Sequence, residues 1–370
     1  MIILLGILKY ILKFIYFFLK LLPTNKKKIL FLSRQSDEPS IDFIYMISDF
    51  NKRYPDFKIV TLCKRMEKNN IKQIISYLFH PLVQIYHLAT STICIVDGYQ
   101  IPVSCLKHKK TLTIIQIWHS LGAIKKFGYQ TLNTPKEQKI AKVMCMHKNY
   151  DLIVSGSKSM TKYFAKAFNY PENKFIECGL PRIDYLLNTE KTNKERVYKK
   201  YPELKHKKIV LYAPTFRTYN EYQVKELINA FGKSSKWQLI IKKHPRMKIQ
   251  IPKEYSYSKV TSLELLSVAN VVVTDYSAIA IEAAILNKPV MLFTYDYNKY
   301  AKTEGINTDI RKDLPGYVFD NPEDLVKCIK NNNYDMEILQ KYKSRYVFNC
   351  DGTTTQKLVD AIMEVRNEKN

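Results

Sequence analysis

A histidine and two lysines follow a β-branched run in residues 115–129, IQIWHSLGAIKKFGY, where a strand is expected to end in a loop. His119 is of the residue type best suited to accept a proton near neutral pH. Lys125 and Lys126 would favour an anion beside it. A single histidine after a strand is more often structural, so this loop alone allows both a catalytic and a structural interpretation.

Two further strand ends carry basic residues. The run VLYAPTFR ends with Thr215 and Arg217, which we expect to be exposed at the strand tip, and LIIKKHPR ends with Lys243 and His244. The carboxyl ends of parallel strands meet at one edge of a sheet and face ligands there. One basic strand end is ordinary, whereas two on successive strands indicate a site for phosphate groups.

The segment 271–293, VVVTDYSAIAIEAAILNKPVMLF, predicts a buried strand, a break at TDYS and then a helix. Backbone N–H groups and the Ser277 hydroxyl would face a ligand at the positive end of the helix, which suits phosphate. Small alanines around Glu282 allow close approach. The alternative is an ordinary α/β unit whose helix is capped by Asp275 or Ser277.

A tight turn precedes another basic residue in the run CGLPRIDYL, residues 178–186. Gly179 and Pro181 form the expected turn and present Arg182 and Asp184. By itself this pattern indicates a turn that closes a domain. Arg182 is also a candidate for binding an anionic acceptor.

These motifs lie between short β-branched runs that alternate with longer mixed segments, the pattern of βαβ units. A polar, charge-rich stretch divides the runs into two series. The sequence therefore predicts an α/β protein of two Rossmann-like domains with a central cleft, preceded by an amphipathic, membrane-associating helix. The predicted parts are 1–28 (helix and basic cluster), 29–187, 188–208 (linker), 209–350 and 351–370, the last a helix able to pack back on the N-terminal domain. The predicted strands are 29–33, 58–63, 93–97, 113–118, 152–155, 175–178, 209–213, 237–242, Val260, 271–274, 290–294 and 317–318, with helices at 262–268, 277–286 and 324–330.

The composition limits the class of protein. The 370 residues include 59 Lys+Arg and 34 Asp+Glu, a net charge of +25 that calls for an anionic partner. Apolar residues at 46% and charged residues at 25% exclude a disordered polycation, a collagen-like chain and a multi-span membrane protein. Seven scattered cysteines without a C-x-x-C pair indicate neither a disulfide framework nor a zinc site, and they favour a reducing cytosol.

The first 22 residues contain three lysines, no acidic residue and otherwise mostly bulky apolar side chains. They lack the basic start and small-residue cleavage site of a signal peptide. A spanning helix would place two lysines near mid-bilayer at about 2.5–3.5 kcal/mol each. On a helix the three lysines share a stripe about 40° wide, so we expect an interfacial helix with this stripe toward water; a core helix with one solvated edge is the alternative. The residues expected at the membrane are Lys9, Lys13, Phe17, Phe18 and Lys20.

Seven ordered motifs resemble the CDP-glycerol glycerophosphotransferase family of teichoic acid and capsule polymer synthesis. They are WHSLGAIKKFG, GLPRIDYL, YAPTFR, KKHP, TDYSAIAIEAAILNKPVMLFTYDYNKY, LPG and DGTTTQKLVDAI, and they cover roughly residues 110–365. The resemblance implies a glycosyltransferase-B-like fold at the cytoplasmic face of the cell membrane, bound peripherally to its anionic surface. It also implies transfer of glycerol phosphate or ribitol phosphate from CDP-glycerol or CDP-ribitol to an anionic lipid-linked polymer acceptor, with release of CMP.

The resemblance implies catalytic roles for His119 and His244, and it places Glu282 at the ribose hydroxyls. Three positions depart from the family pattern: Ser120 replaces a glycine, Ala278 replaces a second serine, and Glu304 replaces an arginine. Together with the strand-end residues, the expected donor-binding set is Thr215, Arg217, Lys243, Thr274, Asp275, Tyr276, Ser277 and Glu282. The expected acceptor-binding set is Lys125, Lys126 and Arg182.

In the expected mechanism, His119 accepts the proton of the attacking hydroxyl, and cations hold the pyrophosphate in line. No cofactor is expected, and no acidic cluster requires a metal ion, although the chemistry allows a divalent one. A membrane-associated glycosyltransferase that uses a nucleotide sugar is the alternative, because the two-domain plan serves it equally well. A nucleic-acid-binding protein would also be basic, but no helix-turn-helix, RNP or zinc-finger pattern is present, so no nucleic-acid partner is expected. The sequence carries no signal of the oligomeric state.

Overall fold

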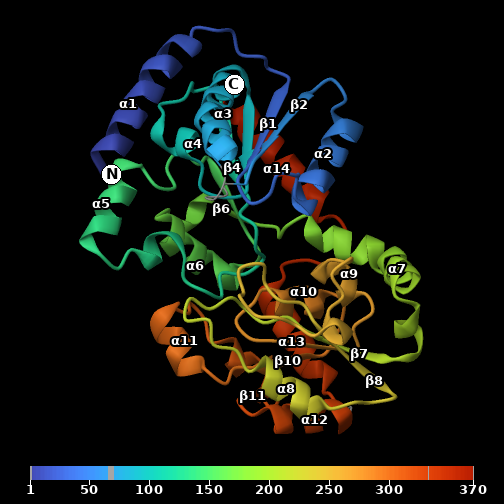
Figure 1. Cartoon of the computed structure of the whole chain (residues 1–370). Helices are drawn as coiled ribbons and strands as arrows, with labels where there is room; N and C mark the ends of the chain where they lie inside the picture. Colours follow the sequence, from blue (N-terminus) through green and yellow to red (C-terminus); the bar gives the residue numbers. More distant parts are fainter. Residues whose placement is uncertain (1, 66–70, 332, 370) are drawn as a thin grey trace. The chain divides into compact units, whose positions relative to one another are not determined.

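The computed structural model describes residues 2–65, 71–331 and 333–369, and the chain forms two compact units (Figure 1). The first unit contains Met1–Ser120, Phe127–Arg182 and Thr353–Asn370. The second unit contains Leu121–Lys126 and Ile183–Gly352. A short piece of the N-terminal half thus belongs to the second unit, and the C-terminal segment belongs to the first.

A six-stranded parallel sheet is the core of the first unit, with the strand order β2-β1-β3-β4-β5-β6. Every residue of β1, β3 and β4 is buried. Such continuous apolar runs suit a parallel sheet that is covered on both faces. The strands are β1 (Lys28–Ser33), β2 (Lys58–Cys63), β3 (Ile93–Val96), β4 (Thr113–Gln116), β5 (Leu152–Ser155) and β6 (Phe175–Glu177).

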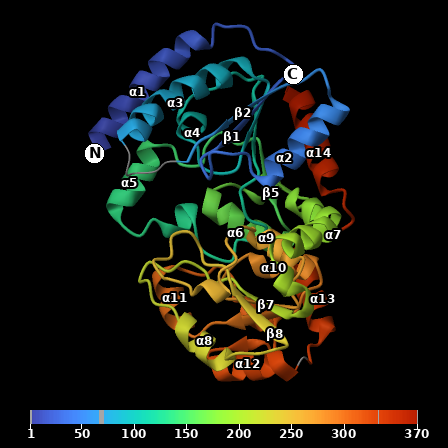
Figure 2. The ribbon, with the colours of Figure 1, turned by 45° about the vertical axis from the view of Figure 1, so that its right-hand side comes forward.

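Helices surround this sheet. The last helix of the chain, α14, lies beside α2 (Figure 2) and also contacts β4. Arg53 at the end of α2 forms an ion pair with Asp360 of α14, which ties the C-terminal segment to the first unit. The helices are α1 (Ile2–Leu19), α2 (Ile41–Arg53), α3 (Ile71–Thr90), α4 (Ile101–Cys105), α5 (Pro135–Val143), α6 (Lys158–Phe168) and α14 (Thr354–Lys369).

A five-stranded parallel sheet is the core of the second unit, with the order β11-β10-β9-β7-β8. Its central strands are fully buried, as in the first sheet. The strands are β7 (Lys208–Tyr212), β8 (Trp237–Ile241), β9 (Val271–Thr274), β10 (Val290–Phe293) and β11 (Val318–Phe319). The helices are α7 (Arg182–Lys200), α8 (Val224–Phe231), α9 (Ser262–Leu266), α10 (Ile279–Ile285), α11 (Tyr297–Thr303), α12 (Pro322–Asn331) and α13 (Met336–Tyr346).

The structure differs from the sequence-based expectation at two places in the second unit. Most of the predicted linker 188–208 is helical, because α7 continues to Lys200 with Asn193 and Val197 as buried contacts. A charge-rich segment can form a helix when one narrow side is covered and the rest is solvated. Val260 is buried but lies outside any strand. The other predicted strands are confirmed to within two residues at each end.

Helix α1 turns part of its lysine stripe toward the protein. Lys9 Nζ donates to the carbonyl O of Val143 (2.6 Å) and to Cys145 Sγ (3.2 Å), and Leu12 and Tyr16 on the same side are 2% exposed. The predicted orientation of the stripe toward water is therefore wrong for Lys9, because its ammonium finds a carbonyl partner in the first unit; Lys13 is exposed. The exposed large apolar residues of the helix and the turn after it are Ile7, Tyr10, Ile11, Phe14, Phe17, Phe18, Leu21 and Leu22.

Among residues 2–65, 71–331 and 333–369, no helix combines the length and the apolar character that crossing a bilayer requires.

Candidate active site

A strained turn carries His119 at the end of β4 in the first unit. Trp118 has φ +59°, in the left-handed region that bulky residues rarely occupy. Its backbone N–H donates to Gln116 Oε1 (2.8 Å), and its indole stacks on Phe127 with ring centroids 4.5 Å apart. Backbone strain of this kind persists only where several surrounding contacts hold the strained residue in place. The contacts of Trp118 therefore hold the turn that places His119 beyond the strand end.

The tautomer of His119 follows from its hydrogen-bond partner. Its Nδ1 lies 2.9 Å from the backbone O of Asp97, directly after β3. A carbonyl oxygen only accepts hydrogen bonds, so Nδ1 carries a proton, and Nε2 carries the lone pair of the neutral ring. His119 is therefore arranged to accept a proton at Nε2.

Asp97 is a buried carboxyl beneath this histidine that the sequence-based reasoning did not identify. Its side chain accepts a hydrogen bond from Ser33 Oγ (2.7 Å), and the residue is 1% exposed. Burial raises the pKa of Asp97 to about 7, with the Asp42 charge adding to the shift and the Ser33 hydrogen bond opposing it. Asp97 lies at the end of a predicted strand, and that position was the only signal in the sequence.

Replacing Asp97 with asparagine should flatten the pH dependence of stability. The folded-state pKa of Asp97 lies above its unfolded value of about 3.9, so the native state keeps a proton that the unfolded chain has released. Stability should therefore fall as pH rises from about 4 to 7, by up to about 4 kcal/mol, and Asp97→Asn should remove that fall. Urea unfolding between pH 4 and 8 measures it. Ser33→Ala, which removes an opposing hydrogen bond, should extend the fall to higher pH; identical slopes in all three proteins would contradict the assignment.

Arg182, expected to bind the acceptor, is already neutralised within the first unit. Its Nη2 lies 2.5 Å and its Nε 3.0 Å from Asp42 Oδ2, and its backbone N–H donates to Asp42 Oδ1 (2.8 Å). Asp42 lies in the first turn of α2 and is 1% exposed. Both residues belong to the first unit, so the charge of Arg182 is neutralised by the fold of that unit.

The strongest departure from expectation is Arg217, which is fully buried in the second unit rather than exposed at a strand tip. Its Nη1 lies 2.9 Å from Asp275 Oδ2, its Nη2 lies 3.0 Å from Asp296 Oδ1, and its Nε also bonds Asp296. Burial opposes the charge of the guanidinium, but Asp275 and Asp296 together raise the pKa of Arg217. One cation thus joins the loops that follow β7, β9 and β10.

The other residues of the TDYS turn complete this buried ion cluster. Asp275 accepts from the backbone N–H and the hydroxyl of Thr215 and from the N–H of Tyr276 (2.7 Å). The ring of Tyr276 stacks on that of Tyr300, with centroids 4.0 Å apart. The Thr274 hydroxyl donates to the carbonyl O of Ala213, directly after β7. All of these predicted donor-binding side chains are buried, because the loops bury their polar groups against one another. Asp296, in the TYDYNKY run, is the member that the sequence-based reasoning did not single out.

Exposed basic residues follow β8 instead. Lys243, His244 and Arg246 are all solvent-exposed, and the ring of Phe216 lies 5.8 Å from that of His244 and 5.9 Å from the guanidinium of Arg246. Lys243 Nζ donates to the carbonyl O of Ile249 (2.6 Å). The structure thus separates the two basic strand ends predicted from the sequence: the one after β7 is buried, and the one after β8 can reach a ligand.

His244 has the opposite ring arrangement from His119. The backbone N–H of Arg246 donates to His244 Nδ1 (3.2 Å). Because Nδ1 accepts, the proton of the neutral ring is on Nε2. His244 can therefore donate a hydrogen bond from Nε2 to an anionic oxygen, a role that complements proton acceptance by His119.

The segment with Lys125 and Lys126 is held in the second unit by backbone hydrogen bonds. Lys126 N donates to Gly305 O (3.1 Å), and Asn307 N donates to Ile124 O (2.8 Å). Gly305 has φ +79°, and a Cβ there would lie 2.8 Å from the Lys126 side chain, so the close approach requires glycine. Lys125 and Lys126 are both exposed at the surface of this unit.

The remaining predicted donor-binding residues lie at and within α10. Ser277 is partly exposed, and its Oγ accepts from the N–H of Ile279 (3.4 Å). Glu282 is 6% exposed. The helix extends only from Ile279 to Ile285, shorter than the predicted 277–286, so its dipole is smaller than the sequence suggested.

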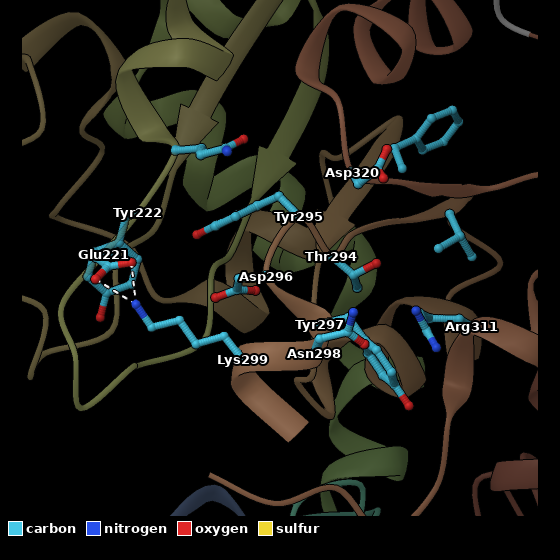
Figure 3. A pocket seen from close by; sticks show the side chains of 13 residues that line it. Glu221, Tyr222, Thr294, Tyr295, Asp296, Tyr297, Asn298, Lys299, Arg311 and Asp320 are labelled. Carbon is cyan, nitrogen blue, oxygen red and sulfur yellow. Dashed lines mark hydrogen bonds and ion pairs between the residues drawn. The ribbon is translucent and has the colours of Figure 1, made fainter. Parts of the chain in front are cut away.

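A pocket of about 910 Å³ opens beside the ion cluster, at the ends of β10 and β11 (Figure 3). Its cations are already paired, Lys299 with Glu221 (2.6 Å) and Arg311 with Asp309 (2.7 Å). None of the residues predicted for the site lines it. With its carboxylates and tyrosine rings, the pocket suits a ligand rich in hydroxyl groups better than one rich in phosphates. The lining includes Glu221, Tyr222, Tyr295, Asp296, Tyr297, Lys299, Arg311 and Asp320.

In the part of the chain that the structure describes, no group of three or more His, Cys, Asp or Glu side chains is placed to hold a metal ion.

The sequence matches the family described as CDP-Glycerol:Poly(glycerophosphate) glycerophosphotransferase over residues 14–364. The chain is 29% identical to the teichoic acid ribitol-phosphate primase of Bacillus spizizenii over 92% of each protein. It is 27% identical to the teichoic acid glycerol-phosphate primase of Bacillus subtilis, over 95% of this chain and 96% of that protein. It is 28% identical to the teichoic acid poly(ribitol-phosphate) polymerase of Bacillus spizizenii, over 96% of this chain but only 59% of that protein's length.

Solved structures show the same fold. The wall teichoic acid polymerase TagF superposes with a TM-score of 0.71 at 20% identity, over 94% of this chain and 90% of that one. A putative UDP-N-acetylglucosamine 2-epimerase from Listeria monocytogenes superposes with a TM-score of 0.59 at 14% identity, over 94% and 98%. Both support an α/β fold with parallel sheets. Because the family match spans nearly the whole chain, this protein belongs to the CDP-glycerol:poly(glycerophosphate) glycerophosphotransferase family and is an enzyme of that class.

Proposed function

We propose that the enzyme transfers glycerol phosphate or ribitol phosphate from the corresponding CDP-alditol to a hydroxyl group of an anionic, lipid-linked polymer, and releases CMP. The family and the primases and polymerases among its relatives support this reaction. The observation that carries the residue roles is the opposite tautomers of His119 and His244. One ring accepts a proton at Nε2, and the other donates from Nε2.

In the proposed reaction the acceptor hydroxyl attacks the β-phosphorus of the CDP-alditol in line. A P–O bond forms to the acceptor as the P–O bond to CMP breaks, and the hydroxyl proton passes to His119 Nε2. The barrier to such a transfer is mostly alignment and charge. A hydrogen bond from His244 Nε2 to a phosphate oxygen would stabilise the charge that collects on CMP.

The burial of the predicted residues divides them between binding and support. Exposed Lys243, His244 and Arg246 would hold the donor phosphates, with partly exposed Ser277 near them. Glu282 is 6% exposed, so its proposed place at the ribose rests on the family resemblance and not on its burial. Lys125 and Lys126 would contact the acceptor's phosphates. We assign Thr215, Arg217, Thr274, Asp275 and Tyr276 to the support of the loops, because they are buried and hydrogen-bonded to one another.

Incubation of the purified protein with a lipid-linked acceptor and one donor at a time tests this function. CDP-glycerol or CDP-ribitol should yield CMP, and a UDP-sugar should yield no nucleotide product. The mass of the polymer product identifies the alditol and shows whether one unit or several are added. Release of a uridine nucleotide without CMP would contradict the proposal and favour a nucleotide-sugar glycosyltransferase.

We also propose that the protein binds peripherally to the anionic cytoplasmic face of the cell membrane through the exposed apolar side of α1. The aromatic residues Phe14, Phe17 and Phe18 on this side are 68%, 60% and 53% exposed. Lys26, between α1 and β1, is exposed and would meet anionic headgroups. Lys27 beside it is also exposed but is paired with Asp56 (2.9 Å). An apolar face beside lysines is the composition of helices that lie in the membrane interface.

A double substitution, Phe17→Ser with Phe18→Ser, should lower the partition of the protein onto anionic vesicles at least tenfold. Each buried phenylalanine contributes about 1.5–3 kcal/mol, and a tenfold change needs only about 1.4 kcal/mol. Phe348→Ser is the matched control, because Phe348 is 56% exposed in the second unit. Co-sedimentation with vesicles measures the partition, and high salt should weaken it without abolishing it. Equal binding of all three proteins would show that α1 does not dock on lipid.

A further inference from the structure

A small basic cavity lies in the first unit, and none of its lining residues is assigned to the reaction. It has a volume of about 250 Å³ and is bounded by the loop after α4, the residues before β5 and the end of α14. Its charged lining residues are Lys107, Lys109, Lys369 and Asp151. Three ammonium groups face one carboxylate, so the cavity favours an anion.

The single carboxylate is already used. Asp151 Oδ2 accepts from Lys369 Nζ (2.7 Å) and from the backbone N–H of Ile114 (2.8 Å). Lys369 also donates to the carbonyl O of Leu112 (2.8 Å). Asp151 therefore neutralises the charge of Lys369, and the positive charges of Lys107 and Lys109 remain.

Those two lysines have no acidic partner among the described residues. Lys109 Nζ donates to the carbonyl O of Leu22 (2.5 Å) and to Thr24 Oγ1 (3.0 Å), both of which are neutral. Lys107 is exposed, and within the described part of the chain it makes neither a hydrogen bond nor an ion pair. An ammonium has three donors, so both lysines can bind an oxyanion without breaking a contact.

The cavity is joined to the membrane-docking helix. Lys109 holds the carbonyl of Leu22, three residues beyond α1, and His108 Nδ1 lies 2.8 Å from the hydroxyl of Tyr16 in α1. His108 Nε2 bonds the carbonyl O of Val103 (2.7 Å), so it donates there and accepts from Tyr16 at Nδ1. Burial lowers the pKa of His108 to about 4, so the ring is a neutral link between the cavity and the helix.

We propose that this cavity binds the phosphate of an anionic phospholipid headgroup in the membrane on which α1 docks. The site adds to the proposed membrane binding and rests on it for its lipid source. Leu21 in the turn after α1 is 76% exposed, and it directly precedes the Leu22 carbonyl that Lys109 holds. A cationic cavity tied to the end of an interfacial helix is suited to the phosphate of a headgroup at that interface. A volume of 250 Å³, against 910 Å³ for the pocket of the second unit, suits a headgroup rather than a nucleotide.

The test uses the full chain and dihexanoyl-phosphatidylglycerol, a soluble lipid, below its critical micelle concentration. The wild-type protein should bind this lipid, and Lys107→Gln should weaken binding about fivefold, the expected effect of one lysine near a phospholipid charge. Lys110→Gln is the matched control, because Lys110 is an exposed neighbour that does not line the cavity. It should change binding less than twofold. Calorimetry measures the affinities.

Each outcome separates the cavity from the other proposals. If the wild-type protein fails to bind the soluble lipid, or if both glutamine variants weaken binding equally, the cavity is not a headgroup site. If inorganic phosphate binds as tightly as the lipid, the ligand is free phosphate and the lipid assignment is wrong. The double Phe17→Ser and Phe18→Ser variant should keep its affinity for the soluble lipid but should no longer bind to vesicles. If the wild-type protein binds the soluble lipid but not vesicles, the docking of α1 and the membrane as the lipid source are wrong, and only the affinity of the cavity for a phospholipid headgroup is supported.

Discussion

Replacing His119 with alanine should lower the turnover of CDP-alditol by 10²- to 10⁴-fold, the usual effect of removing a general base. The affinity for the donor should remain close to that of the wild-type protein, because His119 acts on the acceptor hydroxyl in the proposed mechanism. The hydrogen bond between Nδ1 and the Asp97 carbonyl keeps Nε2 as the accepting nitrogen. Steady-state CMP release gives the turnover, and calorimetry with CDP-glycerol or CDP-ribitol gives the affinity.

His206→Ala is the control for this experiment, because His206 is an exposed histidine of the second unit outside the proposed site. It should leave turnover and affinity unchanged. His244→Ala should differ from both, since loss of a donor to the departing CMP should reduce turnover and also weaken donor binding. A His119→Ala enzyme with near wild-type turnover would refute the general-base role.

Replacing Arg217 with methionine should destabilise the protein by about 3–5 kcal/mol, because two buried carboxylates would lose their cation. Asp275 is fully buried, and Asp296 has 10% of its side chain exposed. Since a whole domain is stable by only about 5–15 kcal/mol, the second unit should unfold at much lower denaturant concentration. Urea unfolding of the full chain, followed by tryptophan fluorescence from Trp237 in β8, measures the effect.

Arg246→Met provides the matched comparison, because Arg246 is an exposed arginine of the same unit. It should change stability by less than about 0.5 kcal/mol, as surface substitutions usually do, and it should raise the KM for the donor. A second comparison is Arg217→Met combined with Asp275→Asn, which removes one of the stranded charges and should regain part of the stability. If Arg217→Met were stable and only impaired in donor binding, Arg217 would be a ligand rather than a support.

The parallel strands and the edge that carries the chemistry were predictable from the sequence. The run VVVT in β9 is β-branched throughout, and the run ICIV in β3 is β-branched except for its cysteine. Such apolar runs are typical of strands that are buried on both faces. Because all strands of each sheet are parallel, residues after successive strands must share one edge. The placement of His119, Thr215, Asp275 and His244 after strands follows from this pattern.

Which of these residues can meet a ligand was not predictable. Arg217 and Arg246 are the same residue type, and each follows a strand of the second sheet, yet one is buried and the other exposed. The difference comes from Asp296, which lies 79 residues after Arg217 in the chain and reaches it only in the folded unit. A local motif does not contain the partner that neutralises its charge.

The first helix, α1, also combines features that the sequence determines with features that long-range contacts decide. By itself, the sequence determined that α1 has lysines along one side and apolar residues along the other, because helical periodicity is a local property. The tertiary structure decided which side packs: Lys9 bonds the carbonyl of Val143, 134 residues away, and the aromatic side remains exposed. The tautomer of His119 was decided in the same way, by the carbonyl of Asp97, which comes from the end of a different strand. The tautomer of His244 instead follows from a local contact, the backbone N–H of Arg246 in the same loop. The sequence thus determined the residue types and their periodicity, and long-range contacts decided their burial, charge state and direction.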